Sequence, residues 1–129
     1  MVTLLLKKSY RHKDLKEIKF NDLWNAYGVF TTMRVIGKSA KILFYKAHID
    51  NLISSLKIYK IYKKSLKKNI IKLIKSNLKI NKNYDHLLRV ASNNKIISIS
   101  LRKRPMPKSN FKLKLVNYKR VDAKYKNLK

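Results

Sequence analysis

A cluster of lysines near the end of the chain gives this sequence its clearest means of covalent chemistry. Lys124, Lys126 and Lys129 surround Tyr125, and Arg120 is close in the sequence. A lysine amine attacks a carbonyl group once it has lost its proton, which is favoured when the side chain is desolvated or lies near another cation. A chain this rich in lysine also forms such clusters by chance, so spacing alone does not single out one nucleophile.

A second candidate site is the run from Phe30 to Arg34, which contains two adjacent threonines. The hydroxyl of Thr31 can hydrogen-bond a carboxylate substrate or a cofactor group. Arg34 can hold a carboxylate through a charge-assisted fork. The alternative is that Thr31 and Thr32 are ordinary strand formers and that Arg34 is a solvated strand residue. The residue types alone favour the second interpretation; Thr31 and Arg34 are our candidate substrate-binding residues because a family resemblance implies that this strand borders the substrate pocket.

The chain has 33 Lys and Arg against 6 Asp and Glu, a formal net charge of +27. Such a charge attracts phosphate, nucleic acid or anionic lipid. However, Ile and Asn are also abundant, as a bias toward AT-rich codons would produce. No zinc-finger spacing, glycine-rich phosphate loop or aromatic RNA-binding signature accompanies the lysines. We therefore favour a solvated lysine surface over a nucleic-acid interface.

Several classes of protein are excluded by composition. With no Cys, the chain has neither disulfides nor cysteine-ligated metals. Its three His and six carboxylates are scattered, so we expect no metal site. No apolar run approaches the roughly 18 residues that span a bilayer, and Val2–Leu6 is too short for a signal peptide. We expect a soluble, cytoplasmic protein without a membrane partner.

Hydrophobic periodicity predicts the elements that position these residues. Alternating and β-branched runs predict strands over 2–6, 28–36, 40–45, 87–91, 96–103 and 111–118, and a helical period predicts helices over 47–59 and 64–78. Residues 7–25 are expected to be a loop, and turns are expected at 37–39 and 92–95. Strands, then two helices, then strands predict one α+β domain over 1–129, an antiparallel sheet with two helices packed on one face.

The run Gly28–Lys38, followed by His48-Ile49-Asp50-Asn51-Leu52, resembles the small N-terminal domain of the class IV aminotransferases, the pyridoxal-phosphate enzymes of fold type IV. Within that family, Phe-Thr-Thr-x-Arg-Val-Ile is most similar to the 4-amino-4-deoxychorismate lyases, because aminotransferase members more often have Glu at the position of Thr31. Tyr125–Lys129 is similar to the segment that carries the family's Schiff-base lysine.

The resemblance implies a pyridoxal-phosphate-dependent lyase that releases pyruvate and forms 4-aminobenzoate for folate biosynthesis. By resemblance, Lys126 carries the cofactor and later moves protons as general base and acid, with Lys124 as the second choice. Asn51 stands where the family has the cofactor-phosphate-binding Arg of a His-x-x-Arg-Leu pattern, and its amide is a weaker, uncharged ligand. His48 is expected to pack at the start of a helix.

Two alternatives remain open. One is a transferase of the same family, a branched-chain or D-amino-acid aminotransferase. The other is a non-catalytic remnant or a basic module that binds a polyanion. The resemblance covers about Phe20 to Lys129, whereas family members continue into a large C-terminal domain that completes the pocket. We therefore expect the small domain of a longer enzyme, or a truncated reading frame, and the family implies a homodimer that acts on a small-molecule substrate.

Overall fold

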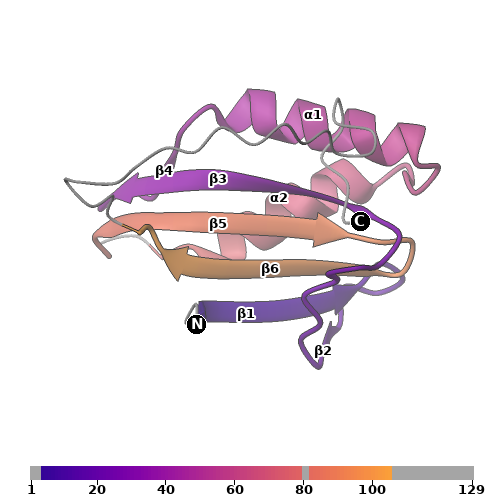
Figure 1. Cartoon of the computed structure of the whole chain (residues 1–129), viewed down its shortest axis with the longest axis horizontal. Helices are drawn as coiled ribbons and strands as arrows, with labels where there is room; N and C mark the ends of the chain where they lie inside the picture. The colour runs from indigo at the N-terminus through magenta and orange to yellow at the C-terminus, as the bar shows by residue number, and fades with distance from the viewer. Residues whose placement is uncertain (1–3, 80–81, 106–129) are drawn as a thin grey trace, which may run out of the picture.

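The computed structural model describes residues 4–79 and 82–105, which form an antiparallel sheet of six strands and two helices (Figure 1). The strands lie in the order β2-β1-β6-β5-β3-β4. Their bounds are β1 Leu4–Arg11, β2 Glu17–Ile18, β3 Val29–Gly37, β4 Lys41–Ile42, β5 Tyr84–Ser92 and β6 Ile96–Lys103, and the helices are α1 Tyr45–Ile58 and α2 Leu66–Asn77. The predicted α+β class is confirmed.

One hydrophobic core joins both helices to a single face of the sheet, here called the helix face. Strand alternation decides which side chains enter it, because successive residues point to opposite faces. In β3, Val29, Met33 and Val35 are buried in this core. The intervening Phe30 and Thr32 lie on the opposite side, here called the open face.

The helices bury the stripes that their periodicity predicts. α1 buries Ile49, Leu52, Ile53 and Leu56, and α2 buries Leu66, Ile70, Leu73 and Ile74. Burying one such side chain contributes about 1.5–3 kcal/mol, so these stripes hold the helices on the sheet. The lysines of α2 are exposed on its other side (Lys67, Lys68, Lys72 and Lys75).

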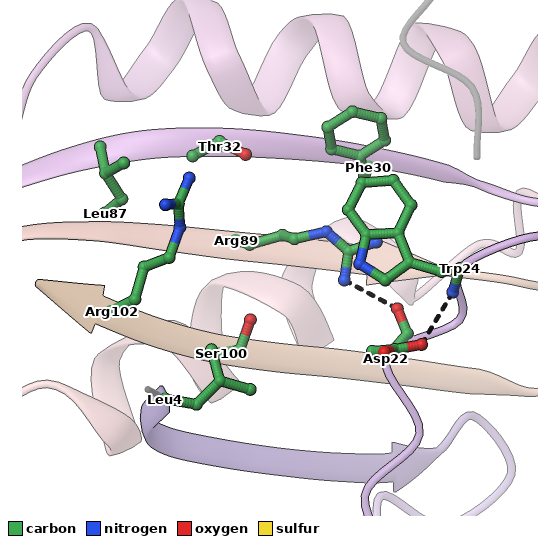
Figure 2. Close-up of a pocket in the computed structure, with 9 residues that line it drawn as sticks. All are labelled: Leu4, Asp22, Trp24, Phe30, Thr32, Leu87, Arg89, Ser100 and Arg102. Atoms are coloured by element: carbon green, nitrogen blue, oxygen red, sulfur yellow. Dashed lines mark hydrogen bonds between the residues drawn. The ribbon is translucent and has the colours of Figure 1, made fainter. Parts of the chain in front are cut away.

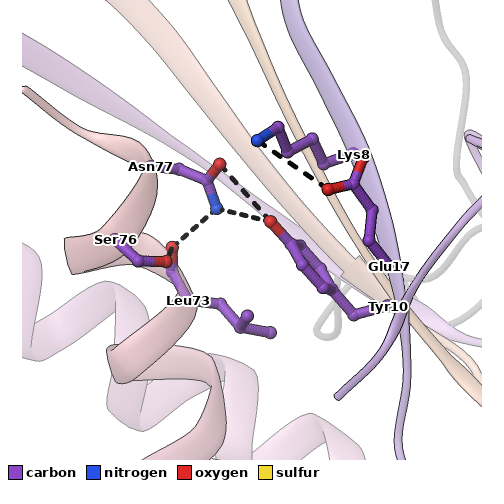
Figure 3. Close-up of polar contacts among 6 residues, drawn as sticks. All are labelled: Lys8, Tyr10, Glu17, Leu73, Ser76 and Asn77. Carbon is purple, nitrogen blue, oxygen red and sulfur yellow. Dashed lines mark hydrogen bonds and ion pairs between the residues drawn. The ribbon is translucent and has the colours of Figure 1, made fainter.

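A small polar network ties the sheet to the end of α2 (Figure 3). The side-chain amide of Asn77 donates to the hydroxyl of Tyr10 at 3.0 Å and to the carbonyl of Leu73 at 2.8 Å. Tyr10 is 8% exposed, so its hydroxyl needs such a partner. The network therefore fixes α2 against β1.

Two sequence predictions are wrong. Residues 7–25 are not all loop, because β1 continues to Arg11 by pairing with β6 and β2 follows at Glu17–Ile18. The strand predicted over 40–45 is limited to Lys41–Ile42, because Phe44 takes a left-handed φ of 53° and α1 begins at Tyr45. The predicted strand over 96–103 is confirmed. The strand predicted over 111–118 lies outside the described residues.

Candidate functional site

The open face carries a cavity of about 550 Å³ above the middle strands (Figure 2). Its floor consists of strand side chains from β3, β5 and β6, and its rim comes from the start of β1 and from the connection before β3. The lining residues are Leu4, Asp22, Trp24, Phe30, Thr32, Leu87, Arg89, Ser100 and Arg102. This open-face pocket combines two guanidinium groups and two hydroxyls with an aromatic wall.

Strand register determines which polar side chains lie next to one another on the floor of the pocket. Thr32 on β3 is directly opposite Arg89 on β5, and Arg89 is directly opposite Ser100 on β6. In the next row, Leu87 is opposite both Arg34 and Arg102. Because directly opposite side chains on one face are about 5 Å apart, the pairing brings two hydroxyls to either side of Arg89.

The rim is fixed by short-range turns between β2 and β3. The side chain of Asn21 accepts from the backbone N–H of Leu23 at 2.9 Å, and that of Asp22 accepts from the N–H of Trp24 at 3.0 Å. The N–H of Asn21 donates to the buried Ser9 hydroxyl at 2.9 Å. These turns, typical of Asn and Asp, hold Trp24 over the sheet.

Arg89 is the central polar group of the pocket. Its Nη1 donates to the backbone carbonyl of Asp22 at 2.7 Å, and its guanidinium lies 4.1 Å from the ring centroid of Trp24 and 5.4 Å from that of Phe30. Its Nε and Nη2 are buried and have no hydrogen-bond partner among the described residues. Two buried donors without a partner carry a desolvation cost that a bound acceptor would remove.

Burial is the main influence on the pKa of Arg89. Desolvation lowers the pKa of Arg89 below its usual value, while the Asp22 charge opposes that shift. The guanidinium nevertheless stays protonated, because its ordinary pKa lies far above neutrality. The same desolvation strengthens its attraction for a carboxylate or phosphate.

The structure separates the two threonines of the predicted substrate-binding run. Thr31 points to the helix face, is 3% exposed and lies 3.0 Å from Nδ1 of His48 through its hydroxyl. Thr32, one residue further, lines the open-face pocket. The period of two along a strand explains why neighbouring threonines have such different surroundings.

Arg34 and Asn51 lie apart from the central guanidinium. Arg34 is on the open face and donates through Nη2 to Asp85 at 3.3 Å, with its Nε buried and unpartnered among the described residues. Asn51 is an exposed residue of α1. Lys46, also on α1, is paired with Asp50 at 2.6 Å.

The proposed cofactor lysine, Lys126, and its runner-up Lys124 lie outside the described residues. Within residues 4–79 and 82–105, no group of His, Asp and Glu is arranged to hold a metal ion. Neither α1 nor α2 is both long and apolar enough to cross a membrane.

Sequence reasoning missed Arg89, Trp24 and Asp22. Arg89 lies in a run of apolar residues on a strand, and a lone Arg in such a run has no distinctive spacing. The successive Asn21 and Asp22 were the available signal, because both residue types favour local turns that position the next residues of the chain.

No protein-family model matches this chain, and no curated protein matches it.

Proposed function

We propose that this chain is the small domain of a pyridoxal-phosphate-dependent lyase similar to 4-amino-4-deoxychorismate lyase, and that its open-face pocket holds a carboxylate of the substrate. The sequence resemblance over Gly28–Leu56 supports the family. The observation that carries the proposal is Arg89, a half-buried guanidinium on the floor of a cavity, of which two nitrogens are buried without a hydrogen-bond partner among the described residues. Of the anions available to a lyase or aminotransferase, a carboxylate is the one that every amino-acid substrate supplies.

The pocket has the chemistry that a carboxylic acid needs. A carboxylate accepts parallel N–H bonds from a guanidinium, which are about twice as strong as neutral hydrogen bonds. The Thr32 and Ser100 hydroxyls on either side of Arg89 can donate to the same anion. Trp24 and Phe30 offer flat apolar surface for the hydrocarbon part of the ligand.

At Asn51, where the family resemblance implies the site of the cofactor's phosphate, the structure has no charged side chain. The exposed amide of Asn51 carries no charge, and Lys46 is committed to Asp50. The cofactor part of the proposal therefore depends on Lys126 alone, and we derive no catalytic step from it.

Covalent trapping tests the cofactor separately from the pocket. The full chain is incubated with substoichiometric pyridoxal phosphate and reduced with borohydride, and the modified peptide is identified by mass spectrometry. We expect modification at Lys126, its loss in Lys126→Ala and its retention in the matched control Lys124→Ala. Modification spread over many surface lysines would refute a dedicated cofactor site.

Fluorescence tests the carboxylate site, because Trp24 is the only tryptophan in the chain and lines the pocket. We expect saturable quenching by benzoate and much weaker binding of the uncharged benzamide. Arg89→Gln should weaken benzoate binding by roughly tenfold or more, since a charge-assisted bond contributes about 1.5–3 kcal/mol. Lys72→Gln, which removes an exposed cation of α2 on the other side of the sheet, should change little. Equal binding of benzoate and benzamide would refute the proposal that the pocket holds a carboxylate.

The aminotransferase alternative predicts the same pocket but a different product. With a full-length enzyme, pyruvate release from an amino-acid substrate indicates the lyase, whereas an amino-group transfer to a 2-oxo acid indicates the transferase. The basic-module alternative is favoured by the exposed lysines of α2. It predicts RNA or DNA binding whose log affinity falls steeply with log salt concentration.

A further inference from the structure

Three connections lie near one another at one end of the sheet (Figure 1), and basic side chains from them line a second cavity. The three are the β1–β2 connection, the turn between β5 and β6, and the connection between α1 and α2. They enclose a cavity of about 340 Å³ whose basic lining residues are Arg11, His12, Lys13, Lys63 and Lys95. We call it the loop-end pocket, and it shares no lining residue with the open-face pocket.

Backbone contacts hold these cations together although they are distant in sequence. The N–H of His12 donates to the carbonyl of Lys95 at 2.8 Å, which joins the first connection to the second. Nζ of Lys63 donates to the carbonyl of Asn94 at 3.2 Å, which joins the third connection to the second. The convergence of the basic side chains is therefore a property of the fold and not of a local run of lysines.

Negative charge in this pocket is scarce. Its lining contains four permanent cations and no carboxylate. The neighbouring Asp14 is paired with Arg11 at 2.7 Å, which leaves Lys13, Lys63 and Lys95 without a carboxylate partner among the described residues. Like charges that converge without counterions repel each other, and a bound anion removes that repulsion.

The pKa of His12 reflects the positive charge around this pocket. Its Nε2 is 2.9 Å from the Ser92 hydroxyl, and its Nδ1 is buried without a hydrogen-bond partner among the described residues. Burial first, and then the Lys63 charge, lower the pKa of His12 to about 4. The imidazole is therefore neutral at pH 7.

We propose that the loop-end pocket binds a phosphate group, carried either by a phosphorylated small molecule or by a nucleic-acid strand. Lys13, Lys63 and Lys95 neutralise the phosphate, and the His12 ring, which lines the same pocket, senses its arrival. The proposal is independent of the lyase function, because it uses neither the open-face pocket nor Lys126.

NMR of the three histidines tests the site on the full chain. Adenosine 5′-monophosphate, a single-stranded RNA oligonucleotide and adenosine are titrated at pH 7 while the imidazole signals of His12, His48 and His86 are followed. We expect saturable shifts of the His12 signals with the phosphorylated ligands, unchanged His48 and His86, and no response to adenosine. Saturation by the mononucleotide identifies a small-molecule site, whereas a response to the RNA alone identifies a strand-binding site.

Charge-matched variants separate this pocket from general attraction by a basic protein. Lys63→Gln/Lys95→Gln removes two pocket cations, and Lys68→Gln/Lys72→Gln removes two exposed cations of α2. The pocket variant should weaken phosphate-ligand binding by roughly a hundredfold or more, because two charge-assisted contacts are lost, while the α2 variant should bind nearly as the parent does. Equal losses in the two variants, or unmoved His12 signals with every ligand, would overturn the proposal.

Discussion

Replacing Arg89 by Met should leave the ligand-free protein as stable as the parent, or slightly more stable, while abolishing carboxylate binding. Met keeps an unbranched apolar stem in the cavity and removes the buried charge. A buried Arg whose donors are all satisfied behaves in the opposite way, since breaking such an interaction typically costs about 3–5 kcal/mol. The variant therefore tests whether the site is arranged for a ligand.

The expected magnitude is set by the contacts of Arg89. Its Nε and Nη2 are buried and unsatisfied, and each such group costs about 1–3 kcal/mol. The change also loses the bond to the Asp22 carbonyl, about 1.5–3 kcal/mol, and the contact with Trp24, about 0.5–1 kcal/mol. The terms nearly cancel, and at their midpoints they favour Met by about 1 kcal/mol.

Urea unfolding of the full chain, with and without benzoate, measures both effects. Benzoate at 100 times its dissociation constant should stabilise the parent by about 2.7 kcal/mol and should not stabilise Arg89→Met. Lys7→Met is the control, because this exposed residue should change stability by less than about 0.5 kcal/mol. A loss of more than about 2 kcal/mol in ligand-free Arg89→Met would mean that the guanidinium is already satisfied and would refute the reasoning.

Three further predictions concern the scaffold. Leu56→Ala should lower the free energy of unfolding by about 2–5 kcal/mol, since the Leu56 side chain on α1 is fully buried. A loss below about 1 kcal/mol would contradict that packing. Tyr10→Phe should cost about 1 kcal/mol, and a double-mutant cycle with Asn77→Ala should show that most of this cost is coupled to Asn77. Because the pKa of His12 is about 4 in the folded chain and its ordinary value is 6.5, the unfolded chain binds the proton more readily. Stability should therefore fall by about 1–2 kcal/mol as the pH drops from 6.5 to 4, a figure reduced for the solvent contact of the half-buried ring, and His12→Gln should remove this loss.

Local patterns predicted the elements whose burial agrees with their own periodicity. The strand at Ile96–Lys103 has the predicted bounds, and α2 buries Leu66, Ile70, Leu73 and Ile74 of the predicted stripe, whereas its fifth member, Leu78, follows the last helical residue. In these segments the apolar residues recur regularly, every second residue in the strand and with the helical repeat in the helix. The structure that the local sequence favours is therefore the one that packing requires. β1 was underestimated because Lys7 and Lys8 interrupt its apolar pattern, and pairing with β6 compensates for that interruption.

The candidate site was predictable from the sequence only in part. Thr31 was selected by resemblance and its substrate-binding role stays a prediction; the structure buries it on the helix face, while Thr32 lines the open-face pocket, because strand alternation turns the two hydroxyls to opposite faces. Arg34 was expected on a strand and lies on the open face, paired with Asp85. Lys126 remains a prediction, because it lies outside the described residues.

The sequence by itself determined the class of the fold, the positions of both helices and the strong excess of positive charge. These depend on composition and on periods of two and 3.6 residues, which are local properties of a chain. Only the tertiary structure decided which charges converge. Arg89 meets Trp24 because a loop folds back over β5, and Lys63 meets His12 because two connections are joined through Lys95 and Asn94. Contacts between residues so distant in sequence depend on strand pairing and packing, which no local pattern encodes.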